Sequence, residues 1–230
     1  MIPERRIRHF RRVLFLLKWN QQGARKQEKE ERIRCMTAIF LDIDGVLNNL
    51  YTTDTIPGRK IIGVEDAMLE RLRKIWDLSD ETVIVLTSTW KEAWEPEQGY
   101  GGTVHGEEGV YLDERLGEYG MKISAKTEDE WAERGAGILR YLEKHPEISR
   151  FVILDDYGFD FREQGLLPYW VQTDFEEENG GLQEKHVKQA ARILKLQDHG
   201  IFRVQEVLAR EKKKKRGWLS RLLTGGGRKE

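Results

Sequence analysis

Residues 40–48 read FLDIDGVLN, an apolar run that changes abruptly into two aspartates separated by one isoleucine. The run starts at Thr37, and Thr37–Leu41 (TAIFL) has the composition of a short strand. Two later runs, Thr82–Leu86 (TVIVL) and Phe151–Leu154 (FVIL), are also apolar and show no polar alternation. Strands of this kind are buried on both faces, as in parallel sheets that helices cover on each side. The sequence therefore predicts a three-layer α/β fold with a parallel sheet.

Helical patterns separate these strands. Apolar side chains recur at helical spacing in Val64–Leu78, Glu128–Lys144 and Leu182–Leu196, and Phe202–Lys215 is expected to form a last helix. Residues 96–110 (PEQGYGGTVHGEEGV) are rich in glycine but lack the GK[ST] ending of a phosphate-binding P-loop, which indicates a flexible connection.

Polar side chains follow each of the three apolar strands. They are Asp42 and Asp44 after the first, Thr87 and Ser88 after the second, and Asp155 and Asp156 after the third. Ligands of open parallel sheets bind beyond the carboxyl ends of the strands, so these groups are expected to converge. Carboxylates that share one edge repel each other unless a cation holds them. Oxygen-only ligands of this kind suit Mg²⁺.

These segments resemble the haloacid dehalogenase (HAD) superfamily of phosphatases. FLDIDGVLN is similar to its first motif, VLTSTW at 85–90 to its second and VILDD at 152–156 to its fourth. The nearest resemblance is to the small HAD domains associated with RNA-repair proteins, through three further features. These are Thr87–Lys91, Arg134-Gly135 before a helix, and the late pairs Thr173-Asp174 and Gly181-Leu182. The resemblance covers about residues 36–196 and implies a Rossmannoid fold and Mg²⁺-dependent phosphatase activity.

The resemblance also implies a role for each site residue. Asp42 would be the nucleophile that accepts the phosphoryl group, and Asp44 would be the general acid and then the general base. Thr87 would bind a phosphoryl oxygen together with a backbone amide beside it, so Ser88 is included in the substrate site. The metal ligands would be Asp42, the backbone carbonyl of Asp44, Asp155 and Asp156. Gly45 permits the sharp turn that aims both carboxylates at one point.

The cation of the family's third motif has several candidates in the sequence. Arg134 fits the Arg-Gly pattern and is preferred, with Lys126 as the second candidate and Lys122 as a third. Two interpretations of Asp160 are possible: it is an acid that supports the site, or it is an ordinary loop acid. Trp90, beside the second motif, is interpreted mainly as a packing residue, with substrate contact as the alternative.

Two basic segments flank an acidic body. Residues 1–34 carry 11 Lys and Arg against 4 Glu, and residues 203–230 carry 10 against 3, so each has a net charge of +7. The total of -1 then leaves -15 for residues 35–202. We expect a basic amphipathic helical extension at 1–34, a HAD-like catalytic domain at 35–200 and a basic C-terminal helix and tail at 201–230. Such extensions fit contact with nucleic acid or an anionic membrane surface, or solvated helix ends.

The remaining features of the sequence suggest a cytoplasmic protein. A lone cysteine, Cys35, provides no disulfide framework. No secretory signal is recognisable, and the apolar run Val13–Leu17 is too short to span a bilayer. Met36 directly precedes the first strand, which leaves open whether residues 1–35 belong to the native product.

The sequence favours a phosphomonoesterase that forms an aspartyl-phosphate. The 43 positions from Asp44 to Thr87 and the 47 from Thr87 to Arg134 leave no room for a full cap domain. An open site of this kind accepts large substrates, including phosphorylated RNA or DNA ends. The alternatives are phosphotransfer to an acceptor other than water, and a catalytically idle HAD domain that binds nucleic acid or a membrane surface.

Overall fold

A computed structural model describes most of the chain from Met36 onward. The described residues are 36–94, 106–129, 131–199, 204, 206–210 and 212–214. The expected extension at 1–34, most of the basic tail and residues 95–105, which include most of the glycine-rich loop, lie outside them. In the described part, none of the helices is long and apolar enough to cross a membrane.

Within the described residues, five strands form a single parallel sheet with the order β3-β2-β1-β4-β5. Their bounds are β1 Met36–Leu41, β2 Thr82–Leu86, β3 Ile123–Lys126, β4 Ile148–Asp155 and β5 Trp170–Gln172. The three strands with continuous apolar runs, β2, β1 and β4, are the three central ones. Burial on both faces explains why these strands lack polar alternation.

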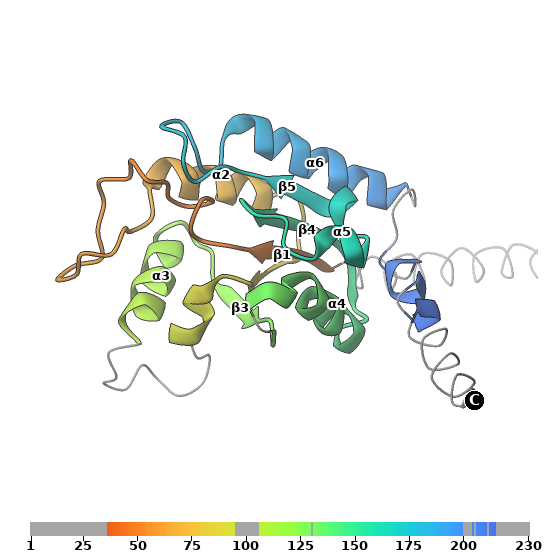
Figure 1. The fold of residues 1–230 in the computed structure, drawn as a ribbon. Coiled ribbons are helices and arrows are strands. Elements are labelled where there is room, and N and C mark those ends of the chain that lie inside the picture. Colours follow the sequence, from red (N-terminus) through yellow and green to blue (C-terminus); the bar gives the residue numbers. More distant parts are fainter. Residues whose placement is uncertain are drawn as a thin grey trace, which may run out of the picture. The chain divides into compact units, whose positions relative to one another are not determined.

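Helices cover the sheet on both faces, as Figure 1 shows. Helices α2 (Asp66–Trp76), α3 (Glu107–Glu118) and α6 (Glu184–Asp198) lie on one face, where α2 contacts α6 and Asp66 of α2 pairs with Arg115 of α3. Helix α4 (Arg134–Lys144) lies on the opposite face, because the chain reverses its direction across the sheet between β3 and β4. The short elements are η1 Thr89–Ala93, η2 Trp131–Glu133, α5 Phe161–Gln164 and η3 Leu167–Tyr169. The three-layer Rossmannoid α/β fold predicted from the sequence is confirmed.

The core lies on both sides of β1 and β4. The ring of Phe40 makes edge-to-face contacts with Tyr141 of α4 and with Phe151 of β4, at centroid distances of 5.9 and 5.7 Å. Phe40 and Phe151 are completely buried. Burying each such side chain contributes about 1.5–3 kcal/mol, so this packing fixes the strands whose ends carry the acids.

The strands and helices predicted from the sequence are present, with differences in their extent and with several elements that were not predicted. Residues 107–110, expected in the glycine-rich loop, open helix α3 instead. The helix expected from Glu128 starts at Arg134, after the 3-10 turn η2. The edge strands β3 and β5 were not predicted, because four and three residues are too few to show a period. In the expected helix Phe202–Lys215, every described residue is helical.

Candidate active site

The turn after β1 brings its two acids to the carboxyl edge of the sheet. The amide of Asp42 donates to the carbonyl oxygen of Leu154 at 2.9 Å, so the strand pairing with β4 continues to the first acid. Gly45 has φ +78, and a Cβ at this position would lie 2.7 Å from the side chain of Asp156. Glycine is therefore required here both for the turn and for the close approach of the second acidic strand end.

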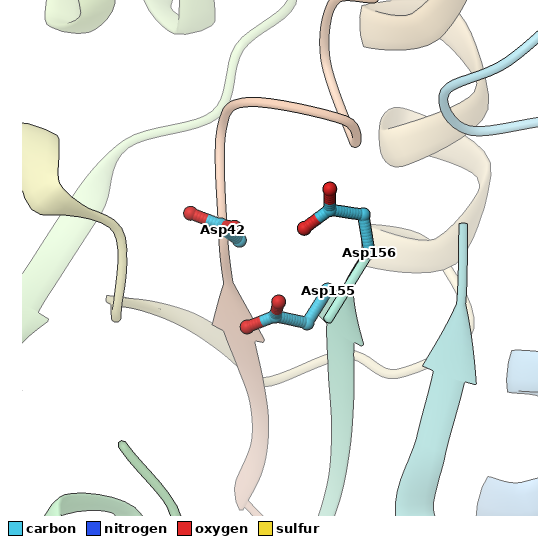
Figure 2. Close-up of side chains that lie close together, drawn as sticks. All are labelled: Asp42, Asp155 and Asp156. Atoms are coloured by element: carbon cyan, nitrogen blue, oxygen red, sulfur yellow. The ribbon is translucent and has the colours of Figure 1, made fainter. Parts of the chain in front are cut away.

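Three carboxylates gather beyond the ends of β1 and β4 (Figure 2). One oxygen from each of Asp42, Asp155 and Asp156 lies within 4.8 Å of the others. Asp42 and Asp155 are buried, and Asp156 is partly exposed. The side chains come from the first and fourth strands in sequence, which are neighbours in the sheet. The predicted convergence of these three acids is thus what the fold produces.

Burial and mutual repulsion disfavour the ionised forms of two of these acids. Burial raises the pKa of Asp156 to about 6, and the neighbouring charge of Asp42 adds to the rise. Burial also raises the pKa of Asp155 well above its usual range, again with Asp42 contributing, whereas Arg134 acts in the opposite direction. Groups with such shifts, in a cluster at a strand edge, mark a functional site.

Arg134 supplies the positive charge beside the cluster. Its Nη1 lies 2.9 Å from Asp42 Oδ2 and 2.5 Å from Asp155 Oδ2, so one nitrogen bridges two acids. The Phe159 ring lies under the guanidinium, with Cζ 4.1 Å from the ring centroid. Phe159 has φ +34, a backbone conformation that a bulky residue adopts only when its surroundings impose it. Arg134 is therefore held between two carboxylates and an aromatic face.

Asp160 fixes the helix that carries Arg134. Its Oδ1 accepts from the amide of Gly135 at 2.6 Å, and its Oδ2 accepts from the amide of Ala136 at 3.0 Å. It thus caps the first turn of α4 from a different segment, whereas Glu133 at the cap position makes no such bond. A Cβ on Gly135 would lie 2.9 Å from Asp160 Oδ1, which explains the glycine after Arg134. These contacts agree with the interpretation of Asp160 as an acid that supports the site.

Asp44 is held on both carboxylate oxygens. Asn48 Nδ2 donates to Oδ1 at 2.9 Å, and the Trp90 indole donates to Oδ2 at 3.1 Å. Burial raises the pKa of Asp44, and the Asn48 hydrogen bond and the charge of Asp42 act next, in opposite directions. A carboxyl group oriented in this way beside Asp42 has the placement and the raised pKa that a general acid requires.

The two polar residues after β2 have different environments. Thr87 is buried, and its Oγ1 makes no hydrogen bond to any residue that the structure describes. Its amide donates to the carbonyl oxygen of Leu41, which places it beside the start of the acidic turn. Ser88 Oγ accepts from the amide of Trp90 and caps η1. Thr87 is thus the one of the pair with an unused buried hydroxyl, which fits contact with a phosphoryl oxygen.

The lysines considered as alternatives to Arg134 have other surroundings. Lys126 Nζ donates to the carbonyl oxygens of Lys91 and Trp94 at 3.1 and 2.8 Å. Lys122 is exposed and precedes β3, at one edge of the sheet, two strands away from β1. These positions favour Arg134, which contacts the acids directly, as the third-motif cation.

The late Thr-Asp and Gly-Leu pairs support the turn after β1. Asp174 Oδ1 accepts from the amides of Glu176 and Glu177, which closes a tight loop. The amide of Leu182 then donates to the carbonyl oxygen of Val46 at 2.8 Å. Gly181 has φ +70 and allows the chain to pass Met68 closely. These residues therefore help to hold the turn after β1 in place.

The acids and the unpaired hydroxyl fit a divalent cation with a bound phosphate. Three carboxylates within 4.8 Å offer hard oxygen ligands of the kind Mg²⁺ takes in proteins. Burial and the charge of Asp42 raise the pKa values of Asp155 and Asp156, so a cation would relieve repulsion that Arg134 offsets only in part. Asp42, Asp155 and Asp156 are thus the residues able to hold the metal.

A parallel sheet of this order, with an acidic DxDG turn and a DD pair on neighbouring strand ends, defines a HAD-like α/β domain. Residues 38–187 match the family described as the HAD domain in Swiss Army Knife RNA repair proteins. This match covers well over half of the chain, and the chain belongs to that family.

Two solved structures are similar at low identity. One is a hypothetical protein from Xanthomonas campestris, with 13% identity and a TM-score of 0.40, covering 79% of this chain and 91% of the other. The second is described as a candidate 3-deoxy-D-manno-octulosonate 8-phosphate phosphatase from Vibrio cholerae, with 11% identity and a TM-score of 0.36. It covers 74% of this chain and 88% of the other. A comparison with curated proteins gives no match.

Several residues around the site were not identified from the sequence. Asn48 stands inside the quoted FLDIDGVLN run, four residues after Asp44, and this helical-turn spacing was the available signal. Phe159 gave no signal, because its role depends on a backbone conformation that only the fold imposes. Trp90 was interpreted as a packing residue, and it both packs and donates to Asp44.

Proposed function

We propose that this protein is a phosphomonoesterase that uses Asp42 as nucleophile and requires Mg²⁺. The observation that carries the proposal is the bridge from Arg134 Nη1 to both Asp42 and Asp155, inside a cluster of three carboxylates. The bridge orients the nucleophile and leaves a positive charge where phosphoryl oxygens would bind. The family supports the same chemistry through its HAD domain.

In the first step, an Asp42 oxygen attacks phosphorus and the ester P–O bond breaks. The protonated Asp44 carboxyl gives its proton to the departing oxygen, so the leaving group departs as an alcohol. Arg134 and the free hydroxyl of Thr87 stabilise the phosphoryl oxygens as charge builds up. The raised pKa of Asp44 favours the protonated form that this step requires.

In the second step, the ionised Asp44 takes a proton from water, and the water oxygen attacks the aspartyl-phosphate. The bond between Asp42 and phosphorus breaks, inorganic phosphate leaves, and Asp44 is protonated again for the next cycle. Asn48 and Trp90 hold the Asp44 carboxylate in one orientation for both proton transfers.

Asp42, Asp155, Asp156 and the backbone carbonyl of Asp44 are the proposed metal ligands. A bound Mg²⁺ would offset the negative charge of the nucleophile and of the phosphate that approaches it. Gly45 leaves room for Asp156 at this position, because any side chain there would displace it.

We propose phosphorylated nucleic-acid ends as the substrate class. Support comes from the family description, which names RNA repair, and from the two +7 segments of the sequence, which would attract a polyanion. Between Asp44 and α2 the chain forms only a short flap with a single bridge, Thr55 to Ile62, and a site so lightly covered admits large substrates. Phosphotransfer to another acceptor and a binding module without turnover are the competing hypotheses.

The test is Mg²⁺-dependent phosphate release from p-nitrophenyl phosphate, nucleotides, and oligonucleotides phosphorylated at the 5′ or 3′ end. Asp42→Asn, which keeps the shape of the side chain but removes the nucleophile, and EDTA are the controls. We expect release that both controls abolish, and the fastest panel member identifies the substrate class. Absence of release from every ester by folded, metal-loaded protein would overturn the phosphatase. Salt-dependent oligonucleotide binding without release would then favour the binding module.

A further inference from the structure

Lys91 is a buried lysine that the proposed mechanism does not use. It lies in η1, directly after Trp90, and only 8% of its side chain is exposed. Its Nζ lies 2.9 Å from Asp129 Oδ2 and donates to the backbone carbonyl oxygen of Asp129 at 3.2 Å. Burying a lysine is costly unless a partner holds its charge, so the ammonium group has a fixed place against Asp129.

Asp129 is confined at the other end of this ion pair. Its side chain is 1% exposed, and among the described residues Lys91 is the cation that pairs with it. A Cβ on Gly137 of α4 would collide with the Asp129 carboxylate, so the helix closes the space on that side. Gly137 follows Arg134 by three residues and therefore shares its side of the helix. Asp129 is thus enclosed between η1 and α4.

A second lysine joins the same two segments in the opposite direction. Lys126 of β3 donates from Nζ to the carbonyl oxygens of Lys91 and Trp94, at the end of η1. Lys91 therefore reaches from η1 to residue 129, and Lys126 reaches from β3 back to η1. A 3-10 turn of five residues has few hydrogen bonds of its own, so contacts of this kind fix its position.

The turn η1 connects this ion pair to the proposed general acid. The Trp90 indole donates to Asp44 Oδ2 at 3.1 Å, and Lys91 is the next residue in the chain. Strand β2, which leads into η1, lies between β1 and β3 in the sheet. One side chain of the turn thus reaches the segment after β1, and the next reaches the segment after β3. A shift that lengthened the indole bond by about 0.5 Å would break it.

We propose that Lys91 is a positioning residue for the proton transfer by Asp44. Its ion pair with Asp129 fixes η1, and Trp90 of η1 then holds the Asp44 carboxyl group in the orientation that the transfer requires. In the described part of the chain Lys91 pairs with Asp129 and with none of the acids of the site, so it acts through Trp90. The inference rests on the proposed phosphatase function and concerns the proton that the leaving group receives.

The experiment compares two esters of similar size that differ in their need for a proton. p-Nitrophenolate leaves as a stable anion, whereas benzyl alcohol must receive a proton from the general acid. We would measure kcat/KM for p-nitrophenyl phosphate and benzyl phosphate at saturating Mg²⁺. This parameter covers the steps up to the cleavage of the ester bond, in which Asp44 is the proposed proton donor.

Two variants remove the ion pair. Lys91→Met removes the ammonium group and leaves Asp129 unpaired, which lowers stability. Lys91→Met combined with Asp129→Asn leaves no buried charge without a partner and serves as the test if the single variant does not fold. Lys144→Met is the matched control, because Lys144 pairs with the adjacent Glu128 at 2.7 Å but its side chain is 62% exposed. Thermal unfolding checks that each variant is folded.

We expect both variants to lower kcat/KM for benzyl phosphate by about tenfold or more, since a positioned general acid contributes about 10²–10⁴-fold. The value for p-nitrophenyl phosphate should fall much less, and Lys144→Met should change neither. In a Trp90→Phe background, which already lacks the indole donor, removal of Lys91 should add little to the loss. This non-additivity separates positioning through Trp90 from a general loss of structure.

Three results would overturn the inference while phosphatase activity remains. They are equal losses for the two esters, no loss for benzyl phosphate, and full additivity of Lys91→Met with Trp90→Phe. Unmodified protein that cleaves p-nitrophenyl phosphate but not benzyl phosphate has no working proton donor, which also overturns it. Failure of the phosphatase proposal has a different signature, because the unmodified protein would then release phosphate from neither ester.

Discussion

At the scale of residues, the positive charge of Arg134 offsets the negative charge of two neighbouring carboxylates. Arg134 Nη1 contacts both Asp42 and Asp155, and only about 4% of the Arg134 side chain is exposed. Removing one partner of a buried ion pair leaves an uncompensated charge, which costs far more than an exposed pair contributes. Arg134 is therefore expected to support both stability and catalysis.

Arg134→Met is predicted to lower the free energy of unfolding by about 3–5 kcal/mol at pH 7, since two buried carboxylates lose their cation. The loss should be smaller at pH 5, because Asp155, whose pKa burial already raises, becomes easier to protonate without Arg134. Urea unfolding without metal at the two pH values measures both effects.

Arg140→Met is the matched control on the same helix. Arg140 is partly exposed and lies 3.9 Å from Glu133, so its replacement should cost at most about 1 kcal/mol. Similar losses for the two variants would show that the Arg134 bridge contributes little to stability.

At the scale of elements, α4 is positioned by a residue outside the helix. Asp160 accepts from the first two amides after Arg134, where a helix has unpaired donors and a partial positive charge. The same helix start presents Arg134 to Asp42. The cap and the proposed catalytic cation are thus mechanically coupled through one turn of helix.

Asp160→Ala is predicted to lower the free energy of unfolding by about 1–2 kcal/mol, the usual cost of a lost helix cap. It should also lower kcat more than tenfold, because Arg134 loses its fixed position. Urea unfolding and steady-state kinetics test the two parts. Glu133→Ala, at the cap position but without a cap bond, should change both only slightly. Unchanged kcat in Asp160→Ala would refute the coupling.

Helix α3 and strands β3 and β5 were not predicted from the sequence for the same physical reason, since each depends on tertiary contacts. Helix α3 begins directly after a glycine-rich stretch, and Gly109 and Gly117 lie within it, so local propensity argued against a helix. Its burial of Leu112 and Leu116 overrides that propensity. Strands β3 and β5 are short edge strands whose existence depends on pairing with β2 and β4, which no local pattern reports.

At the scale of the whole molecule, the cluster of Asp42, Asp155 and Asp156 lowers the stability of the metal-free protein. Metal binding should restore that stability. Asp156, with a pKa raised to about 6, binds a proton more readily in the folded than in the unfolded state. Stability without metal should therefore fall as the pH rises from about 4 through 6. Metal binding requires the ionised carboxylates, so its stabilising effect should grow over the same range.

We predict that saturating Mg²⁺ raises the melting temperature by several degrees at pH 7 and by much less at pH 5. Thermal unfolding with and without Mg²⁺ at each pH provides the measurement. In Asp156→Asn the dependence on pH and the Mg²⁺ shift should both shrink. A Mg²⁺ shift of equal size at both pH values would contradict carboxylate ligation by this cluster.

The sequence by itself determined the sheet and the acids on its edge. Apolar strands that end in Asp42, Thr87 and Asp155 report burial on both faces, and parallel strands bring their carboxyl ends to one edge whatever else the chain does. The family followed from the same residues. This information is local, because each strand carries its own pattern and its own terminal residues.

Tertiary structure alone decided what surrounds these acids. The sequence already favoured Arg134 over the lysines, but the contact of Arg134 with Asp42 depends on where α4 starts, and Asp160 of a later segment caps that start. The hydrogen bond from Trp90 to Asp44 depends on the pairing of β1 with β2, because this pairing places η1 beside the turn after β1. These contacts join residues far apart in the chain, and their energies come from packing that exists only after the sheet has formed.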